Sequence, residues 1–240
     1  MSSRGRVNRL SRTQDLAANL AAVRERISTA CEAAGRGPDE ITLVAVTKTF
    51  PATDVRLLAE LGITDVAENR DQEAAAKTAE CADLALTWHF VGQLQTNKAR
   101  SVVSYADVVH SVDRQRLVTA LSRAAVDLGR SPRCLIQVSL DETEGRGGVR
   151  PEGVPALADA IAAAEGLELA GVMAVAPLGA DPAPAFARLA EISLSLRATY
   201  PAAKTVSAGM SGDMEHAIAS GATHLRVGTA LLGGRRAIVR

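Results

Sequence analysis

A lysine stands at the end of an apolar run early in the chain. Lys48 follows the segment LVAVT (43–47), which reads as a buried strand. A charged amine at the tip of such a strand is costly unless it has a specific role, because it gives up hydration there. Desolvation or a neighbouring cation lowers a lysine pKa from its ordinary value of about 10.4 and makes the amine a usable nucleophile. Lys48 is therefore a candidate for covalent chemistry, and the alternative is a lysine that reaches past the strand tip to water.

Two glycine-containing segments near the other end of the chain have the composition of an anion site. Gly212 lets the backbone approach a ligand closely, Ser211 offers a hydroxyl, and the helix expected next presents unpaired amide groups. Gly228 and Thr229, after the last apolar strand, can act in the same way. Ordinary helix capping by Ser211 or Asp213 is the alternative. An amine opposite a phosphate cradle would suit a phosphorylated aldehyde held as a Schiff base.

Other polar residues fall near the ends of predicted strands. Asn69 follows Glu68 and could hydrogen-bond a ring hydroxyl or a carbonyl oxygen, or it could be a turn asparagine. Arg226 is too polar for a strand interior unless it meets a ligand acceptor or a buried carboxylate such as Glu68, and we favour the ligand. His89 and His110 lack a partner pair of the kind that binds metals, so each is interpreted as a structural histidine.

The elements that must position these residues alternate between strands and helices. Strands are predicted at 41–47, 64–67, 86–91, 106–110, 133–139, 168–174, 204–207 and 223–227. Helices are predicted at 13–34, 53–61, 70–80, 97–103, 113–128, 153–164, 183–199 and 212–220. Neighbouring parallel strands require crossover connections, so the pattern predicts an α/β fold, a (β/α)8 TIM barrel with an extra N-terminal helix. An open doubly wound sheet is the alternative.

In such barrels functional groups gather at the carboxyl ends of the strands, where most of the candidate residues fall. No linker rich in Gly, Pro or Ser divides the 240 residues, so we expect one barrel domain over 13–240. Residues 1–12 carry four arginines and are expected to form a flexible arm. Glu73 and Lys77, four residues apart, are expected to pair on a helix surface.

The composition excludes several classes of protein. Lys plus Arg equals Asp plus Glu at 27 each, and aromatic residues are only 2%, which argues against a nucleic-acid partner. The three cysteines are widely spaced, which argues against a disulfide framework or a zinc site, and no other metal site is expected. No apolar stretch is long enough for a membrane span, and no signal-peptide core follows the basic start. We therefore expect a cytoplasmic protein with no membrane contact.

Six segments of the chain resemble the pyridoxal phosphate homeostasis proteins, which are single-barrel relatives of the alanine racemase N-terminal domain. They are LVAVTKTF (43–50), AENRDQE (67–73), WHFVGQLQTNK (88–98), HSVDR (110–114), GVMAVAP (171–177) and SAGMSGDMEHAIASGATHLRVGTALLG (207–233). The resemblance runs in order from about residue 14 to 234 and covers nearly the whole chain. It departs from the family at Ala208, Arg70, Ser139 and Arg146, which touch the rim of the pocket and one loop.

This resemblance implies a binding site for pyridoxal 5′-phosphate (PLP). Lys48 would hold the cofactor as a Schiff base, and Arg226 would face the pyridine nitrogen. The remaining implied site residues are Asn69 beside the ring, Met210 in the wall, and Ser211, Gly212, Gly228 and Thr229 around the phosphate. An arginine at the ring nitrogen disfavours its protonation, which weakens the cofactor as an electron sink. A site of this kind would hold the aldehyde without strongly activating it.

The function implied is reversible PLP binding without evident catalysis, in intracellular PLP homeostasis and indirectly in the balance of amino acids and keto acids. PLP-dependent apoenzymes are the expected recipients, and we expect a monomer and no catalytic residue. The first alternative is a PLP-dependent amino-acid racemase. Racemases that resemble this barrel use a second, β-rich domain and a tyrosine on the opposite face of the ring. Here the chain ends soon after the eighth strand, and Tyr105 and Tyr200 precede strands, on the wrong end of the barrel. The second alternative is a Schiff-base aldolase, for which Glu68 is the nearest proposed carboxylate.

Overall fold

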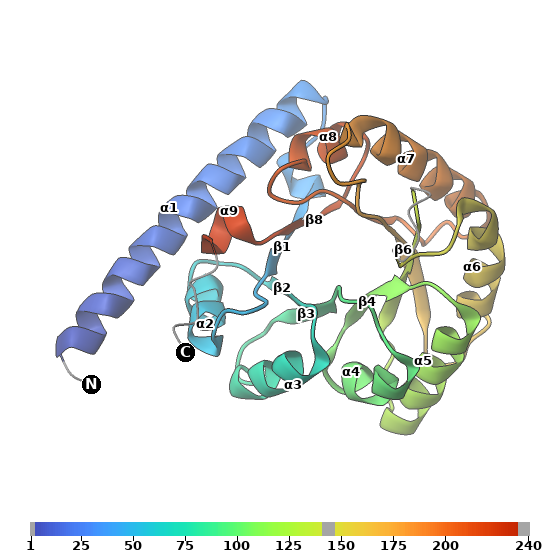
Figure 1. Ribbon diagram of the computed structural model, residues 1–240, viewed down its shortest axis with the longest axis horizontal. Helices are drawn as coiled ribbons and strands as arrows, with labels where there is room; N and C mark the ends of the chain where they lie inside the picture. Colours follow the sequence, from blue (N-terminus) through green and yellow to red (C-terminus); the bar gives the residue numbers. More distant parts are fainter. Residues whose placement is uncertain (1–2, 141–146, 235–240) are drawn as a thin grey trace.

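Eight parallel strands close into one barrel in the order in which they occur along the chain (Figure 1). The computed structural model describes residues 3–140 and 147–234. The strands are β1 (Thr42–Val46), β2 (Asp65–Glu68), β3 (Thr87–Phe90), β4 (Val108–Val112), β5 (Arg133–Gln137), β6 (Glu168–Met173), β7 (Thr205–Ser207) and β8 (His224–Val227). Because β8 pairs with β1, the last strand of the chain adjoins the first, and β7 lies one strand further round the barrel. The TIM-barrel prediction is confirmed, and the open sheet is excluded.

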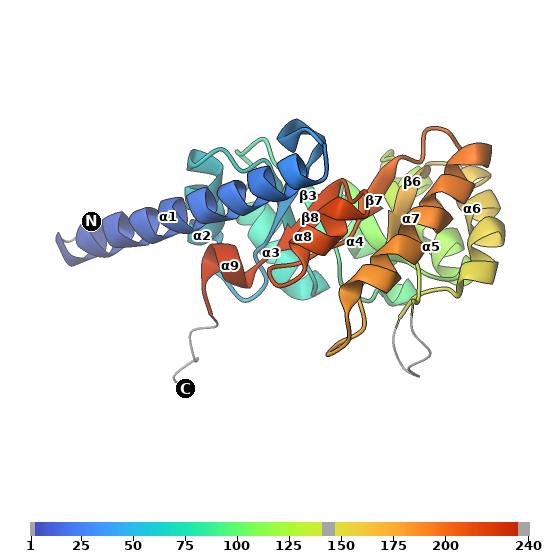
Figure 2. The ribbon, with the colours of Figure 1, turned by 90° about the horizontal axis from the view of Figure 1, so that it is seen from above.

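Helices form the outer layer around these strands (Figure 1). They are α1 (Ser3–Ala33), α2 (Ala52–Glu60), α3 (Asp71–Glu80), α4 (Ala99–Tyr105), α5 (Gln115–Leu128), α6 (Val154–Ala162), α7 (Pro182–Thr199), α8 (Met214–Ala219) and α9 (Thr229–Leu232). Three short 3-10 helices accompany them: η1 (Pro38–Glu40), η2 (Thr96–Lys98) and η3 (Pro151–Gly153). Figures 1 and 2 show α1 lying along one side of the barrel, where it packs against α8 and α9.

The beginning of the first helix corrects the sequence prediction. Helix α1 begins at Ser3 rather than near residue 13, so the predicted start of the helix is wrong, while the flexibility expected of the arm stays a prediction. Two of the basic side chains there have partners on α2: Arg9 pairs with Glu60 at 2.7 Å, and Arg12 pairs with Asp54 at 2.7 Å. No proline precedes residue 38, so no residue that lacks a backbone N–H interrupts the helix on its way toward the amino terminus.

Alternation along the strands sorts side chains between the inside of the barrel and the layer beneath the helices. Val44, Val46 and Ala67 form one small apolar cluster inside the barrel. A second interior cluster contains Val108, Leu135, Ala170 and Met173. The intervening residues, such as Ala45, Val66, Phe90 and Ile136, join the large core between strands and helices. The interior is therefore filled by two apolar clusters, and polar side chains occupy the remaining inward positions.

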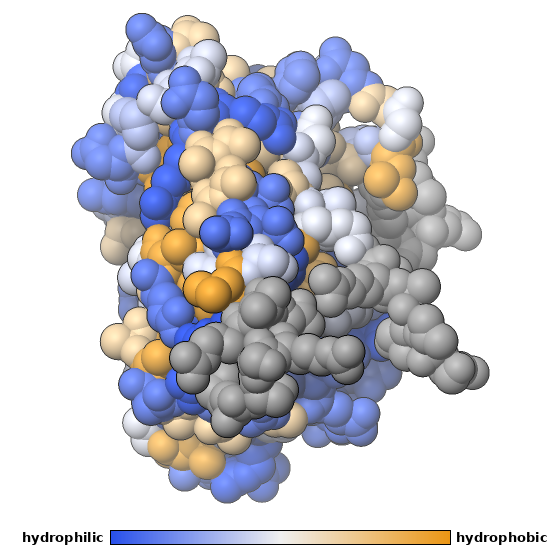
Figure 3. All heavy atoms as spheres, turned by 90° about the vertical axis from the view of Figure 1, so that its left-hand side faces the viewer, coloured by the Kyte–Doolittle hydropathy of each residue, from blue (hydrophilic) through white to orange (hydrophobic). Residues whose placement is uncertain are grey.

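The outer surface on the side of α1 is mixed in character. Figure 3 shows hydrophilic residues spread among smaller hydrophobic patches over the part of that face that the structure describes. Among the described helices, none is both long enough and apolar enough to cross a bilayer.

Candidate functional site

Lys48 lies at the carboxyl end of β1, where the strand alternation directs it toward the barrel interior. Val44 and Val46 belong to the interior cluster, and Thr47, between Val46 and Lys48, faces the helix layer. The backbone amide of Thr47 still donates to the carbonyl of Ala67 at 2.9 Å, so the pairing with β2 continues up to Lys48. The Lys48 side chain is half-buried. Its position matches that of an amine at the mouth of the barrel.

The chain turns sharply directly after Lys48. Thr49 has a φ of 69°, in the left-handed region that β-branched residues rarely adopt. Such a conformation costs on the order of 1–3 kcal/mol and persists only where the surroundings fix it. The amide of Phe50 closes the turn by donating to the carbonyl of Thr47 at 3.1 Å. The turn therefore holds the backbone of the candidate nucleophile in one place.

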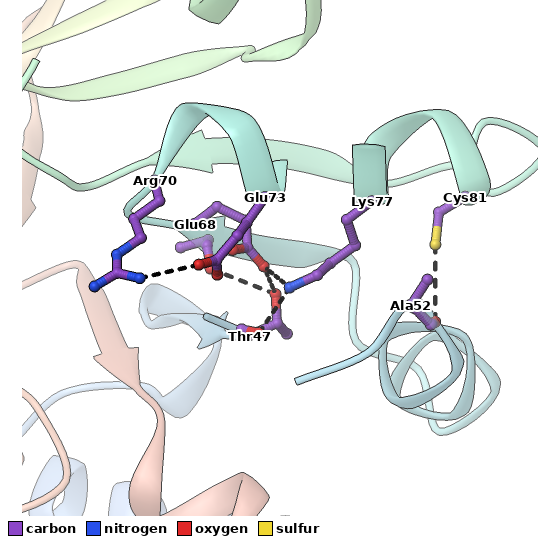
Figure 4. Close-up of polar contacts among 8 residues, drawn as sticks. Thr47, Ala52, Glu68, Arg70, Glu73, Lys77 and Cys81 are labelled. Carbon is purple, nitrogen blue, oxygen red and sulfur yellow. Dashed lines mark hydrogen bonds and ion pairs between the residues drawn. The ribbon is translucent and has the colours of Figure 1, made fainter. Parts of the chain in front are cut away.

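A buried polar group, which we call the outer cluster, joins the ends of β1 and β2 to helix α3 (Figure 4). It consists of Thr47, Glu68 and Lys77, which are each at most 7% exposed. The hydroxyl of Thr47 donates to Glu68 Oε1 at 2.6 Å, and Lys77 Nζ donates both to the Thr47 carbonyl at 2.9 Å and to Glu68 Oε1. Because Thr47 and Glu68 directly precede Lys48 and Asn69, the cluster fixes the backbone of both candidate site residues.

Two expectations about these residues are wrong. Lys77 is buried against Glu68 rather than paired with Glu73 on the helix surface, and Glu73 instead pairs with Arg70 at 3.2 Å. Glu68 faces α3 and not the barrel interior, so it cannot act beside Lys48 as the aldolase alternative requires. Burial raises the pKa of Glu68, although the charge and hydrogen bond of Lys77 oppose the shift.

Asn69 is half-buried at the carboxyl end of β2, next to the end of β3. The contact between the two strand ends is tight, since a Cβ on Gly92 would lie 2.0 Å from the Asn69 carbonyl oxygen. Only glycine fits at position 92 without a shift of the backbone. The neighbouring Arg70 is exposed and extends away from Lys77 toward Glu73 (Figure 4).

The loop after β7 contacts the segment after β8, as expected for the two halves of one anion site. Gly209 has a φ of 89°, and its carbonyl accepts from the Arg226 amide at 3.0 Å. The Met210 amide donates to Asp213 Oδ1 at 2.6 Å, which shapes the loop. The hydroxyl of Ser211 accepts from the Ala230 amide at 3.1 Å. This last bond joins the β7 loop directly to helix α9.

These segments lie on the same rim as Lys48. Gly228 is the N-cap of α9, and a Cβ placed on it would lie 3.4 Å from the carbonyl oxygen of Val46, two residues before Lys48. Thr229 and Gly212 are both exposed, and a Cβ on Gly212 would meet no atom within 4 Å. The structure therefore brings the amine and the glycine segments together at the carboxyl end of the barrel. Helix α9 has too few turns for a periodic signal, and the sequence did not predict it.

Arg226 is 5% exposed and points into the barrel. Its Nη1 donates to Ser207 Oγ at 2.6 Å and its Nη2 donates to the Ala174 carbonyl at 2.8 Å. The alternative of a pair with Glu68 is therefore wrong. Burial lowers the pKa of Arg226 to about 10, which leaves the guanidinium charged at neutral pH. Arg226 thus supplies a fixed buried cation below the rim.

His89 and His110 are structural, as predicted, and each ring has a partner on both nitrogens. His89 Nε2 lies 2.9 Å from Asp65 Oδ1, and His89 Nδ1 lies 2.8 Å from His110 Nε2. His110 Nδ1 lies 3.0 Å from Ser207 Oγ. We call the five residues Arg226, Ser207, His110, His89 and Asp65 the inner chain. Sequence reasoning missed Asp65 and Ser207, although both occupy inward positions on their strands.

The two tyrosines lie among the outer helices. Tyr105, the last residue of α4, bonds Asp71 at 3.4 Å, and Tyr200, which follows α7, bonds Asp159 at 2.5 Å. Neither hydroxyl is directed at Lys48. Of the positions that depart from the resembled family, Ala208 is buried beside Gly209, and Arg146 lies outside the described residues.

Comparison with known proteins agrees with this geometry. A family model described as the alanine racemase N-terminal domain matches residues 18–236. Pyridoxal phosphate homeostasis proteins from Mycobacterium tuberculosis and Escherichia coli are 47% and 37% identical to this chain. The matches cover 94% and 92% of this chain and 95% and 97% of those proteins. The chain belongs to the family of the alanine racemase N-terminal domain, within the group of the pyridoxal phosphate homeostasis proteins.

Solved structures show the same relationship in three dimensions. The structure of PipY from Synechococcus elongatus with PLP bound is 37% identical, with a TM-score of 0.78, and the match covers 91% of this chain and all of PipY. Alanine racemase from Clostridium difficile is 15% identical with a TM-score of 0.71, and the match covers 91% of this chain but 56% of the racemase. The racemase therefore shares the barrel fold and no more.

Proposed function

We propose that this protein binds pyridoxal 5′-phosphate through Lys48 and acts in PLP homeostasis without catalysing a reaction of its own. One observation carries the proposal: the Lys48 strand end, the β7 loop and the start of α9 lie on one rim of a closed barrel. A phosphorylated aldehyde needs an amine at one end and an anion cradle at the other. The homeostasis proteins at 37–47% identity, and PipY with PLP bound, support the same ligand.

The residues present fit this cofactor. The Lys48 amine would bond its aldehyde carbon, and the buried cation of Arg226 would face its ring nitrogen. Ser211, Gly212, Gly228 and Thr229 would hold the phosphate through a hydroxyl and backbone amides. Asn69 would bond the ring substituents, and the half-buried Met210 would cover one side of the pocket. When bound, PLP supplies an electron sink whose strength depends on protonation of its ring nitrogen.

The charge of Arg226 favours holding the cofactor over using it. A cation opposite the ring nitrogen disfavours a second positive charge there, so the cofactor is a weaker electron sink. The curated relatives cited above are named as homeostasis proteins, whereas the racemases share under 25% identity. We therefore assign no catalytic residue to this chain.

The wider setting is also part of the proposal. PLP-dependent apoenzymes are the recipients we propose, because a covalently held aldehyde is released by exchange with another amine. We propose that a monomer acts, since the rim is formed by one chain. Cys31, Cys81 and Cys134 are all buried free thiols, a pattern that suits the reducing cytoplasm.

The test is an absorbance spectrum of the PLP-loaded protein, followed by borohydride reduction and peptide mass mapping. We expect a yellow protein with the reduced adduct on Lys48, and loss of both in Lys48→Ala. Lys98→Ala is the matched control, because Lys98 also lies near the rim and pairs with Asp71 at 3.6 Å. An adduct on another lysine, or unchanged colour in Lys48→Ala, contradicts the proposal. Exchange of the amino-acid α-hydrogen at an enzyme-like rate in deuterated water would support the racemase instead.

A further inference from the structure

The inner chain is an unbroken run of side-chain hydrogen bonds that crosses the barrel beneath the proposed site. It starts at Arg226 on β8 and passes through Ser207 on β7, His110 on β4 and His89 on β3 to Asp65 on β2. The four successive distances are 2.6, 3.0, 2.8 and 2.9 Å. The bond between His110 and Ser207 spans the interior from one side of the barrel to the other, because β4 and β7 are not neighbours.

The two ends of the inner chain determine the direction of its first and last bonds. The guanidinium of Arg226 can only donate, and an ionised Asp65 can only accept. Burial raises the pKa of Asp65, but hydrogen bonds from His89 and Thr64 outweigh it and the net shift is downward, so Asp65 is ionised at neutral pH. His89 must then donate from Nε2.

When both histidine rings are neutral, the ends of the inner chain also determine the direction of the hydrogen bonds in its middle. His89 Nδ1 accepts from His110 Nε2–H, His110 Nδ1 accepts from the Ser207 hydroxyl, and the Ser207 oxygen accepts from Arg226. Every donor then meets one acceptor. The reverse direction through His110 requires a second proton on His89. That proton would add a cation in an interior that already contains Arg226.

The surroundings favour the neutral arrangement. His110 is fully buried, and burial, with the charge of Arg226 acting in the same direction, holds its pKa well below the usual value. The His224 ring centre lies 6.3 Å from that of His89, and Arg133 also acts on His110 through its charge. Asp65 is the carboxylate that contacts this group, and Asp213 acts on Arg226 from the β7 loop.

We propose that Ser207, His110, His89 and Asp65 are positioning residues for Arg226, joined in a chain that donates in one direction only. This inference rests on the proposed function of the site. Two of the five N–H groups of Arg226 are committed, one to Ser207 and one to the Ala174 carbonyl, so the plane of the guanidinium is fixed. Its other N–H groups have no hydrogen-bond partner among the described residues, so they remain for a ligand. The chain thereby sets how Arg226 presents its charge to the cofactor ring.

Asp65, the end of the inner chain away from Arg226, can be substituted without changing any residue of the rim. Asp65 is the first residue of β2, its side chain is 18% exposed, and it lines a cavity of about 680 Å³ between α1 and the strands. A change at Asp65 therefore acts on Arg226 only through the histidines and Ser207. This makes Asp65→Asn a sensitive variant, since asparagine can still accept from His89 but carries no charge.

The first test uses the protein without cofactor. Nitrogen NMR of histidine-labelled protein at pH 7 should show His89 and His110 both neutral and both protonated on Nε2. His110→Gln and His89→Gln spectra assign the signals. A His110 protonated on Nδ1, or a doubly protonated His89, overturns the direction of the chain whether or not PLP binds.

The second test uses PLP-loaded protein and compares two buried serines. We expect Ser207→Ala to weaken PLP binding about tenfold and to shift the pH profile of the bound-cofactor absorbance, because Arg226 loses a charge-assisted bond. Ser111→Ala is the control, since Ser111 is equally buried, neighbours His110, and its hydroxyl has no hydrogen-bond partner among the described residues. Asp65→Asn should shift the same profile by a smaller amount.

The outcomes separate this inference from the proposed function. Wild-type protein that fails to bind PLP on Lys48 contradicts the proposed function and removes the positioning role with it. Wild-type protein that binds PLP, with a folded Ser207→Ala variant of unchanged affinity and pH profile, overturns the positioning role alone. Thermal unfolding of each variant confirms that it is folded before its spectrum is compared.

Discussion

The outer cluster and the inner chain are both largely buried groups of polar side chains on the barrel strands, yet they place their charges differently. In the outer cluster, Glu68 and Lys77 are in direct contact, and Glu68 Oε2 has no hydrogen-bond partner among the described residues. In the inner chain, the charges of Arg226 and Asp65 are separated by three neutral groups with a partner at every atom in the run. The outer cluster fixes the backbone that carries Lys48 and Asn69, and the inner chain, as we propose, orients the side chain of Arg226.

The energetics follow from that difference. Removing one partner of a buried ion pair leaves an uncompensated charge and costs about 3–5 kcal/mol. Removing one hydrogen bond from a chain costs about 1–3 kcal/mol, and the larger values apply where a charged group loses its partner. Changes in the outer cluster should therefore appear mainly in stability. Changes in the inner chain should appear mainly in the properties of the bound cofactor.

The largest expected effect is that of Lys77→Met. Methionine fills similar space, but it leaves Glu68 buried without its cation, so we expect the free energy of unfolding to fall by about 3–5 kcal/mol at pH 7. Urea unfolding followed by circular dichroism measures this loss. Lys98→Met is the matched control, because its pair with Asp71 is 40% exposed on the lysine side and should be worth less than about 1 kcal/mol.

A double variant sharpens the same point. Replacing both partners, as in Glu68→Leu with Lys77→Met, removes the uncompensated charge, so it should recover at least half of the stability lost in Lys77→Met alone. If the double variant is instead the less stable of the two, the cluster stabilises the fold through its hydrogen bonds to Thr47 more than its charges cost.

An intermediate effect is expected from Asp65→Asn as a function of pH. The pKa of Asp65 is lowered in the folded protein below its usual value of 3.8, so the charge of Asp65 contributes stability above that value and loses it as the pH falls. The variant should be less stable than the wild type by about 1 kcal/mol at pH 7. The difference between the two urea midpoints should shrink as the pH falls below about 4. A difference that stays constant with pH would mean that charge at Asp65 has no part in the inner chain.

Most of the barrel could be read from local patterns, because each strand and crossover helix has its own apolar signal. Every predicted strand lies within two residues of the observed one at each end. Lys48 and the glycine segments could be predicted to lie near one another because the strand ends of a parallel barrel share one rim. The start of α1 was missed because basic residues near a terminus are ambiguous until their partners, such as Glu60 and Asp54, are known.

The inner chain could not have been predicted in the same way. Alternation places Asp65, His89 and Arg226 on inward positions, but it does not say which strands face one another across the barrel. The contact between His110 and Ser207 joins residues 97 positions apart in the chain, and it depends on the closure of the whole barrel. For the same reason the sequence could not show whether Arg226 bonds Glu68 or another acceptor, because that depends on which side chains meet inside the closed barrel.

The smallest expected effect tests whether hydrogen bonding, rather than burial, distinguishes the two buried serines Ser111 and Ser207. Ser111 is 1% exposed and its hydroxyl has no partner among the described residues, so Ser111→Ala loses no hydrogen bond. We expect its urea midpoint to be unchanged, or its stability to rise by up to about 1 kcal/mol, because a desolvated hydroxyl is removed. Ser207→Ala breaks two bonds and should lose about 1–3 kcal/mol. A loss above about 1 kcal/mol in Ser111→Ala would mean that this hydroxyl bonds a buried water. Ser111 would then be hydrogen-bonded like Ser207, and the two serines would no longer differ in that respect.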